Sequence, residues 1–236
     1  MKRLVVAGHF APGEAVPLSQ EQLHYLQTVL RLSPGDKFVL IDQQGQGYLA
    51  VLQSEHCHLE MTAAIADNEP QIDVELCLPL LKGDKLEWVI QKSVELGVQR
   101  IVLYSAARSV VKVTGSFQRK LARWQTIAVN AVQQCRRTRI PEIVGMKNLE
   151  QLPGGDRLSL FAWEEAKDPG LSRLTASVTG ALRILVGPEG GLTEEEAEIL
   201  TQAGWQQVSL GPRILRAETA AIAMLTCVLF AAGELG

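Results

Sequence analysis

Residues 186–196 have the sequence Val-Gly-Pro-Glu-Gly-Gly-Leu-Thr-Glu-Glu-Glu, and residues 210–220 have the related sequence Leu-Gly-Pro-Arg-Ile-Leu-Arg-Ala-Glu-Thr-Ala. Each stretch follows a short apolar run that is typical of a buried strand, contains a Gly-Pro turn and leads into a predicted helix. Two such strand–loop–helix units in tandem place both loops at the same end of a parallel sheet, where open α/β sheets bind their ligands. We therefore expect these two loops to form a ligand site.

Outward from these loops, strands and helices alternate from residue 72 to the end of the chain. This alternation favours an α/β domain with a mostly parallel sheet over residues 72–236. Residues 1–68 instead contain short β-type runs separated by Gly-containing turns. They also contain one short helix, for which Ser19 and Gln22 have the spacing of a capping box. The sequence thus predicts a small β-rich domain followed by an α/β domain.

The composition is that of an ordinary globular protein. The chain has 236 residues, of which 47% are hydrophobic and 21% are charged. The longest apolar run, at 220–232, is too short to cross a bilayer, and no signal peptide is evident, so we expect a cytoplasmic protein without a membrane span. The four cysteines have no CxxC spacing, and His56 and His58 lack a third ligand, so we expect neither disulfides nor a metal.

The first loop is not a phosphate-binding motif. It lacks both the GxGxxG fingerprint and the lysine of a P-loop, and three glutamates at 194–196 would repel a phosphate. Gly187, Gly190 and Gly191 allow close backbone approach to a ligand. A ligand without negative charge suits this loop, and a positively charged sulfonium cofactor is one such ligand. The alternative is a sharp structural turn that requires glycine.

Charged residues follow the second loop at the start of an otherwise apolar helix. Arg216 is placed to neutralise a developing anion or a phosphate, and Glu218 to orient it or to cap the helix. The alternative is a purely structural ion pair between the two.

A basic block occupies residues 100–139. It contains nine Lys and Arg residues and no Asp or Glu, although the whole chain has a net charge of −3. Such a block predicts a polyanionic partner, because phosphate contacts release counterions. The alternative is a solvated helix face that happens to be basic.

With these motifs, the chain resembles the 16S ribosomal RNA uridine-N3 methyltransferases of the SPOUT superfamily. The two quoted loops carry most of the resemblance. Further matches are His24, Val-Leu-Arg-Leu at 29–32, Lys-Gly-Asp-Lys at 82–85, Arg-Ser-Val-Val-Lys at 108–112, and the segments 91–98, 123–124 and 134–137. The resemblance covers nearly the whole chain.

The resemblance implies a PUA-like RNA-binding domain at 1–68 and a methyltransferase domain with a deep trefoil knot at 72–236. It implies a homodimer, S-adenosylmethionine as cofactor, and no metal. The implied cofactor residues are Trp163, Gly187, Pro188, Glu189, Gly190, Gly191, Leu210, Gly211, Leu215 and Ala220. The implied RNA-binding residues are Arg3, His24, Arg31, Lys82, Arg108, Lys112, Arg123 and Arg137.

Three positions depart from the family pattern. Asn130 and Gln133 stand where glutamates are expected, and Ala107 stands where an acidic residue is expected. These changes remove negative charge from the basic block. They concern RNA docking, or a salt-bridge network there, rather than the cofactor site.

The expected reaction is methylation of N3 of a uridine in 16S ribosomal RNA within the 30S subunit. The N3–H of uracil is a weak acid, and methylation requires that its proton be removed. A nearby cation would stabilise the negative charge that develops, and Arg216 is the first candidate. Glu189 or Glu218 would assist deprotonation, and the sequence does not rank them. Two alternatives stay open: a methyltransferase of the same fold acting on another RNA, and a non-catalytic RNA-binding factor of ribosome assembly.

Overall fold

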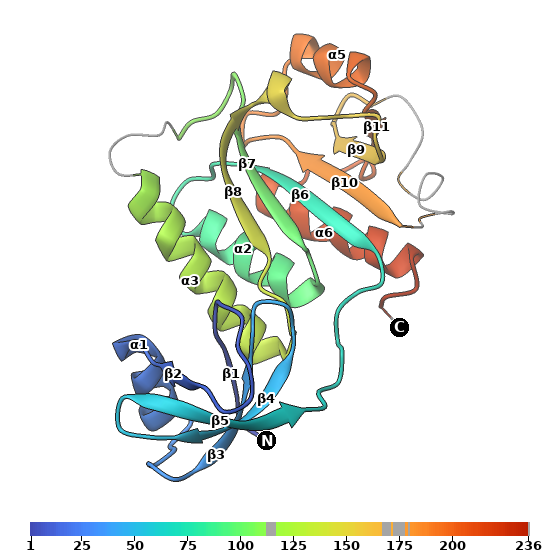
Figure 1. The fold of residues 1–236 in the computed structure, drawn as a ribbon. Helices are drawn as coiled ribbons and strands as arrows, with labels where there is room; N and C mark the ends of the chain where they lie inside the picture. Colours follow the sequence, from blue (N-terminus) through green and yellow to red (C-terminus); the bar gives the residue numbers. More distant parts are fainter. Residues whose placement is uncertain (112–116, 167–170, 172–177, 179, 236) are drawn as a thin grey trace. The chain divides into compact units, whose positions relative to one another are not determined.

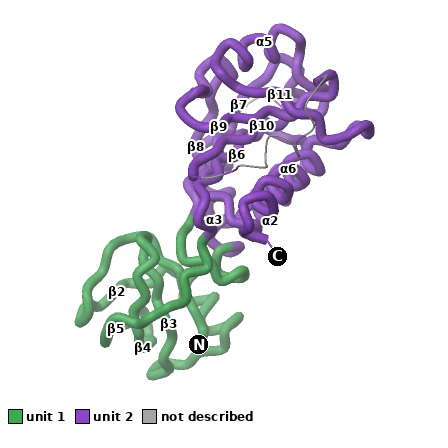
Figure 2. The backbone as a smooth tube through the Cα atoms, turned by 90° about the vertical axis from the view of Figure 1, so that its right-hand side faces the viewer, with its two compact units in different colours: residues 1–69, 132–140 green, residues 70–131, 141–236 purple. Residues whose placement is uncertain are grey.

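The structure, a computed structural model, describes residues 1–111, 117–166, 171, 178 and 180–235 (Figure 1). Its contacts divide the chain into two compact units (Figure 2). The first unit comprises residues 1–69 and 132–140, and the second comprises residues 70–131 and 141–236. The inclusion of residues 132–140 in the first unit is a feature that no sequence motif indicated.

The first unit is built on a mixed five-stranded sheet, in the order β1-β3-β4-β5-β2. Its strands are β1 (Arg3–Val5), β2 (Ala15–Pro17), β3 (Lys37–Ile41), β4 (Gly47–Leu52) and β5 (His56–Ala63). The β1 and β3 strands are parallel, and the other neighbours are antiparallel. Leu4, Phe38, Leu40, Leu52 and Leu59 are fully buried in its core, so the unit has a hydrophobic centre of its own.

The predicted helix of the first unit begins at the predicted cap. The α1 helix (Gln20–His24) continues directly into a π-helical turn, η1 (Tyr25–Val29). The backbone N–H of Gln22 donates to Ser19 Oγ at 3.2 Å, and that of Ser19 donates to the Gln22 side chain at 2.8 Å, which confirms the capping box. Beyond the turn, Arg31 has a φ of 53°, in the left-handed region.

A buried carboxylate joins residues 132–140 to the rest of the first unit. Arg137 donates two hydrogen bonds to Glu69 Oε2, from Nε at 2.9 Å and Nη2 at 2.6 Å. The backbone N–H groups of Thr138 and Arg139 donate to Glu69 Oε1 at 2.7 and 2.9 Å. Because both carboxylate oxygens are bonded to donors, the charge of Glu69 is compensated inside the unit.

The second unit contains a six-stranded, entirely parallel sheet, in the order β11-β9-β10-β6-β7-β8. Its strands are β6 (Asp73–Pro79), β7 (Arg100–Ser105), β8 (Glu142–Asn148), β9 (Leu158–Ala162), β10 (Ala181–Val186) and β11 (Gln206–Val208). The predicted α/β class with a parallel sheet is therefore confirmed.

Helices cover both faces of this sheet. They are α2 (Lys85–Leu96), α3 (Phe117–Cys135), α5 (Glu194–Gln202) and α6 (Ala217–Ala231), with a short 3₁₀ turn, η2 (Leu149–Gln151). The α6 helix packs against α2 and β10, whereas α5 packs against β11 and η2 (Figure 1). Successive side chains of a strand point to opposite faces of the sheet. On one face, Cys77, Phe161 and Leu185 belong to a hydrophobic cluster that includes residues of α5.

Two helix ends in this unit follow the predicted signals. Thr193 caps α5 through a capping box with Glu196, whose carboxylate also accepts the Thr193 N–H at 2.9 Å. Gly97 ends α2 with a φ of 113°, which glycine adopts without steric cost.

The trefoil knot implied by the resemblance stays a prediction, because much of 167–179, between β9 and β10, lies outside the described residues. An experimental structure that traces this segment tests it.

Candidate methyl-donor and RNA site

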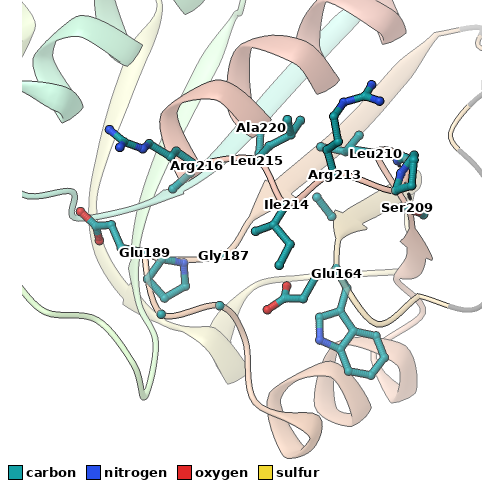
Figure 3. A pocket seen from close by; sticks show the side chains of 18 of the residues that line it. Glu164, Gly187, Glu189, Ser209, Leu210, Arg213, Ile214, Leu215, Arg216 and Ala220 are labelled. Atoms are coloured by element: carbon teal, nitrogen blue, oxygen red, sulfur yellow. Dashed lines mark hydrogen bonds between the residues drawn. The ribbon is translucent and has the colours of Figure 1, made fainter.

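The two glycine-bearing loops meet at one end of the parallel sheet. Strands β11, β9 and β10 are neighbours, so the segments beyond their carboxyl ends come together. They border a cavity of about 850 Å³ (Figure 3). It is lined by residues 162–164, 187–191 and 209–217, with Lys85 and Ala220. The structure thus brings together all ten residues that the resemblance assigns to the cofactor.

Close packing explains the glycines of the first loop. Gly191 has a φ of 73°, and its N–H donates to the carbonyl of Pro188 at 2.9 Å. A Cβ at Gly191 would collide with the carboxylate of Glu164, and a Cβ at Gly190 would lie 2.9 Å from Cβ of Arg108. Side chains at these positions would therefore displace residues that form the loop's surroundings, which favours glycine for steric reasons.

The second loop presents Arg216 at its end. The loop turns at Gly211, whose φ is 102° and whose N–H donates to Ser209 Oγ at 3.2 Å. Arg216 is the N-cap residue of α6, and its exposed side chain makes no capping hydrogen bond. Within the described part of the chain, its guanidinium forms no ion pair. Arg216 is therefore available to a ligand at the wall of the cavity.

Glu189 already has a partner. Its Oε1 accepts the backbone N–H of Lys82 at 3.0 Å, so the carboxylate holds the loop before α2 beside the cavity. Figure 3 shows Glu189 on the same side of the cavity as Arg216. This contact explains the residue structurally without any role in proton transfer.

Glu218 lies next to the cavity but behind another side chain. Its Oε1 is 3.0 Å from Nζ of Lys85, and it is Lys85 that lines the cavity. Burial opposes ionisation of Glu218. The backbone hydrogen bond and the charges of Lys85 and Arg216 outweigh burial and hold its pKa below the usual value. Its Oε2 is buried and has no hydrogen-bond partner among the described residues.

Lys85 and Glu164 are among the lining residues that the sequence motifs did not assign to the site. Lys85 belongs to a matched motif, but nothing in its spacing places it beside Glu218. Glu164 follows β9, and its carboxylate faces the cavity beneath Ile214, as Figure 3 shows. Within the described residues, Glu164 forms no ion pair, which leaves a negative charge at this wall. The acidic character expected of the loop thus comes from Glu164 rather than from the glutamates of α5.

The candidate RNA-binding residues fall in both units. In the first unit, Arg31 is exposed, Arg3 donates to the carbonyl of Arg136 at 3.3 Å, and His24 Nδ1 lies 3.3 Å from Thr28 Oγ1. Arg137 is only 3% exposed and is bound to Glu69, so its guanidinium is part of the interior. Its proposed role in RNA binding is therefore replaced by a structural one.

In the second unit, the described candidates Lys82, Arg108 and Arg123 are exposed, and Arg108 and Arg123 form contacts with neighbouring residues. Arg108 donates to the carbonyls of Gly190 and Leu192 at 3.2 and 3.4 Å, which ties it to the first loop. Arg123 pairs with Glu87 at 2.7 Å and remains two-thirds exposed, at 66%. Lys82 is exposed, and Lys112 lies outside the described residues.

Two of the positions that depart from the family pattern differ in their contacts. The backbone N–H of Ala107 donates to Glu196 Oε1 at 2.6 Å, so this segment is anchored through its main chain. In contrast, Oε1 of Gln133 is buried and has no partner among the residues that the structure describes. The resulting local charge remains basic.

In the described ranges, no group of three or more His, Cys, Asp or Glu side chains is arranged to hold a metal ion. Among the helices described, none is long and apolar enough to span a membrane.

Comparison with protein families identifies two matching domains. Residues 67–229 match the model of an RNA methyltransferase domain. Residues 18–61 match the model of an RNA methyltransferase PUA domain. Together these matches cover both units of the chain.

Several relatives share most of their length with the chain. Ribosomal RNA small subunit methyltransferase E of Bacillus subtilis is 35% identical over 229 residues, covering 90% of this chain and 89% of the relative. The protein of the same name from Synechocystis is 33% identical and covers 96% of this chain and 78% of its own. The Neisseria gonorrhoeae protein of that name, solved with bound S-adenosyl methionine, is 30% identical with a TM-score of 0.85, covering 98% of this chain and 97% of that one.

Proposed function

Because this chain belongs to the ribosomal RNA small subunit methyltransferase E family, with a PUA domain before its RNA methyltransferase domain, we propose that it methylates N3 of a uridine in 16S ribosomal RNA. The methyl donor is S-adenosylmethionine. The observation that supports the proposal most strongly is the cavity at the ends of β9, β10 and β11, where the exposed Arg216 and a glycine-lined wall meet.

The residues of the cavity fit S-adenosylmethionine. When bound, this cofactor supplies a methyl group on a positively charged sulfonium. The carboxylate of Glu164 offers a negative charge without a partner in the described residues, and Gly187, Gly190 and Gly191 leave room for close backbone contact. Relatives solved with this cofactor include a methyltransferase of Legionella pneumophila, 28% identical over 97% of each chain with a TM-score of 0.86.

Arg216 has the position that the reaction on uracil requires. N3 loses its proton to the solvent, and the electron pair left on nitrogen forms the new bond to the methyl carbon. The electrons of the broken carbon–sulfur bond remain on sulfur. Negative charge develops on N3 and on the two flanking carbonyl oxygens, and the Arg216 guanidinium stabilises it. The rest of the cavity holds the two reactants in line.

The two glutamates have supporting roles in this proposal. Glu189 accepts the Lys82 N–H and so positions the loop before α2. Glu218 binds Lys85 and, with a pKa held low, remains ionised at neutral pH. Neither carboxylate is needed to take the N3 proton, because the imide is acidic enough to release it to water once its anion is stabilised.

RNA contacts are proposed for the exposed residues His24, Arg31, Lys82, Arg108 and Arg123, for the half-buried Arg3, and for Lys112, which lies outside the described residues. Such contacts with phosphates add affinity without sequence preference. A substrate in the 30S subunit also places the protein in the cytoplasm.

Methylation of isolated 30S subunits tests the function. Subunits from a strain without the modification are incubated with the purified protein and S-adenosylmethionine, and the nucleosides of 16S ribosomal RNA are identified by mass spectrometry. We expect one 3-methyluridine per subunit. Methylation of a different RNA or of a ribose hydroxyl would instead indicate a related methyltransferase. Binding to 30S subunits without methyl incorporation would indicate an assembly factor.

We also propose that the protein is a homodimer. Apolar side chains on α6 remain accessible along one face, at Ile222, Ala223, Cys227 and Phe230, and Phe230 is 68% exposed. A contiguous apolar face of this kind is typical of a protein–protein interface. Light scattering should give twice the chain mass of 25.8 kDa, and Phe230→Glu should reduce it to one chain. Met61→Glu, at another exposed apolar residue, should leave the dimer intact, and a monomeric wild-type protein would contradict the proposal.

A further inference from the structure

Lys85 lines the cavity as a cation in addition to Arg213 and Arg216. It is the first residue of α2, and its Nζ is 3.0 Å from Oε1 of Glu218 in the first turn of α6. The Lys85 side chain is 37% exposed, whereas that of Glu218 is 15% exposed. The carboxylate therefore lies inside, and the ammonium lies between it and the cavity.

The positive charge of Lys85 lies where it does not favour folding, at the positive end of a helix dipole. Two helices, α2 and α6, begin at the cavity, and the positive ends of their dipoles point toward it. A lysine at the first position of a helix adds a positive charge where negative charge is preferred. Neither Asp84 nor Arg216 caps its helix with a side-chain hydrogen bond. The starts of α2 and α6, together with Lys85 and Arg216, thus add positive charge to one part of the cavity, which suits an anion that forms during reaction.

On these grounds we propose that Lys85 is a catalytic residue, whose ammonium donates a hydrogen bond to one of the carbonyl oxygens beside N3, and that Glu218 is the residue that positions it. The inference rests on the proposed function. Uracil N3 lies between two carbonyl oxygens that share the developing charge, so two cations, Lys85 and Arg216, match the two oxygens. Oε1 of Glu218, on a side chain that is only 15% exposed, fixes the otherwise flexible lysine side chain, which preorganises the donor.

The test uses the full-length protein and compares Lys85→Ala with Lys92→Ala. Lys92 is a matched control, since it is on the same helix and pairs with Glu95 at 2.8 Å but does not line the cavity. Single-turnover methylation of unmodified 30S subunits is measured from pH 6 to 10, and S-adenosylmethionine affinity is measured by calorimetry. For Lys85→Ala we expect a rate about 10²-fold lower at neutral pH, as for the loss of one oxyanion donor, with unchanged cofactor affinity.

Two readouts separate catalysis from structure. The rate of Lys85→Ala should continue to rise with pH beyond the point where the wild-type rate levels off, because deprotonation of N3 has become harder. On 30S subunits that contain 5-fluorouracil, a more acidic imide, the deficit of Lys85→Ala should shrink at least 5-fold. Glu218→Gln should lower the rate less than Lys85→Ala does. In the double variant, Glu218→Gln should add little to the rate deficit of Lys85→Ala, because both substitutions act on one hydrogen-bond donor.

Each other outcome contradicts the inference in its own way. An equal deficit on uracil and 5-fluorouracil with an unshifted pH profile would make Lys85 merely structural. Weaker S-adenosylmethionine binding with a normal single-turnover rate would make it a cofactor ligand. An unchanged rate would exclude any role. If the wild-type protein and Lys92→Ala both fail to methylate, the proposed function itself is wrong. Failure of the proposed function is thereby distinguished from failure of the inference about Lys85.

Discussion

Arg216→Ala is expected to lower the single-turnover rate of uridine methylation by about 10²–10³-fold, the range for removal of a group that stabilises a developing oxyanion. The guanidinium stands at the start of α6, has no ion-pair partner among the described residues, and lines the cavity that we propose to hold cofactor and uracil. Its removal leaves the imide anion uncompensated, so the loss falls on the rate of the chemical step rather than on binding.

Arg213 supplies the matched control for this prediction. It belongs to the same loop and carries the same charge, but Figure 3 shows its side chain pointing away from Arg216 and Glu189. Arg213→Ala should change the rate only a few-fold. Arg216→Lys should recover part of the rate, since it keeps the charge but loses the planar fork. A normal rate for Arg216→Ala, with S-adenosylmethionine still bound in calorimetry, would show that the arginine does not stabilise the charge.

Glu69→Gln is expected to lower the free energy of unfolding by about 3–5 kcal/mol, the usual loss when one partner of a buried ion pair is removed. Glu69 is 9% exposed and Arg137 is 3% exposed, so the variant would remove the charge of the carboxylate that binds this buried guanidinium. Urea unfolding followed by circular dichroism measures the change. The matched control is Glu60→Gln in the same unit, whose exposed pair with Lys37 should contribute less than about 1 kcal/mol.

The difference between wild type and Glu69→Gln should also depend on pH. Burial opposes ionisation of Glu69. The hydrogen bonds and charge of Arg137, with the N–H groups of Arg139 and Thr138, outweigh burial and hold its pKa below the usual value. The stabilisation is therefore fully present above the unfolded pKa of about 4.3 and is lost as the pH falls through the folded value. A difference that stays constant down to pH 2 would show that the charge of Glu69 contributes nothing.

Local signals in the sequence predicted local structure well. The capping residues Ser19 and Thr193 and the terminal Gly97 act within one helical turn, and the structure places each as expected. The glycine loops were found for the same reason, because a positive φ and close packing restrict the residue type at single positions. The parallel sheet followed from alternation of apolar runs, which reflects burial on both faces.

Pairings between distant residues were not predictable in the same way. Lys85 and Glu218 are far apart in sequence, and only the packing of α2 on α6 makes them neighbours. Arg137 belongs to a basic block that indicated RNA, yet its partner Glu69 makes it an interior residue. A count of charges along a chain shows neither which charges are neutralised nor which face the solvent.

The split composition of the first unit has a consequence for synthesis on the ribosome. Residues 1–69 emerge first, but residues 132–140, which complete this unit, follow only after much of the second unit has been made. At about 5–20 residues per second, residues 1–69 wait several seconds before Arg137, the partner of the Glu69 carboxylate, is synthesised. Synthesis of the first unit therefore begins before that of the second, but the first unit cannot complete its folding until residues 132–140 have been made.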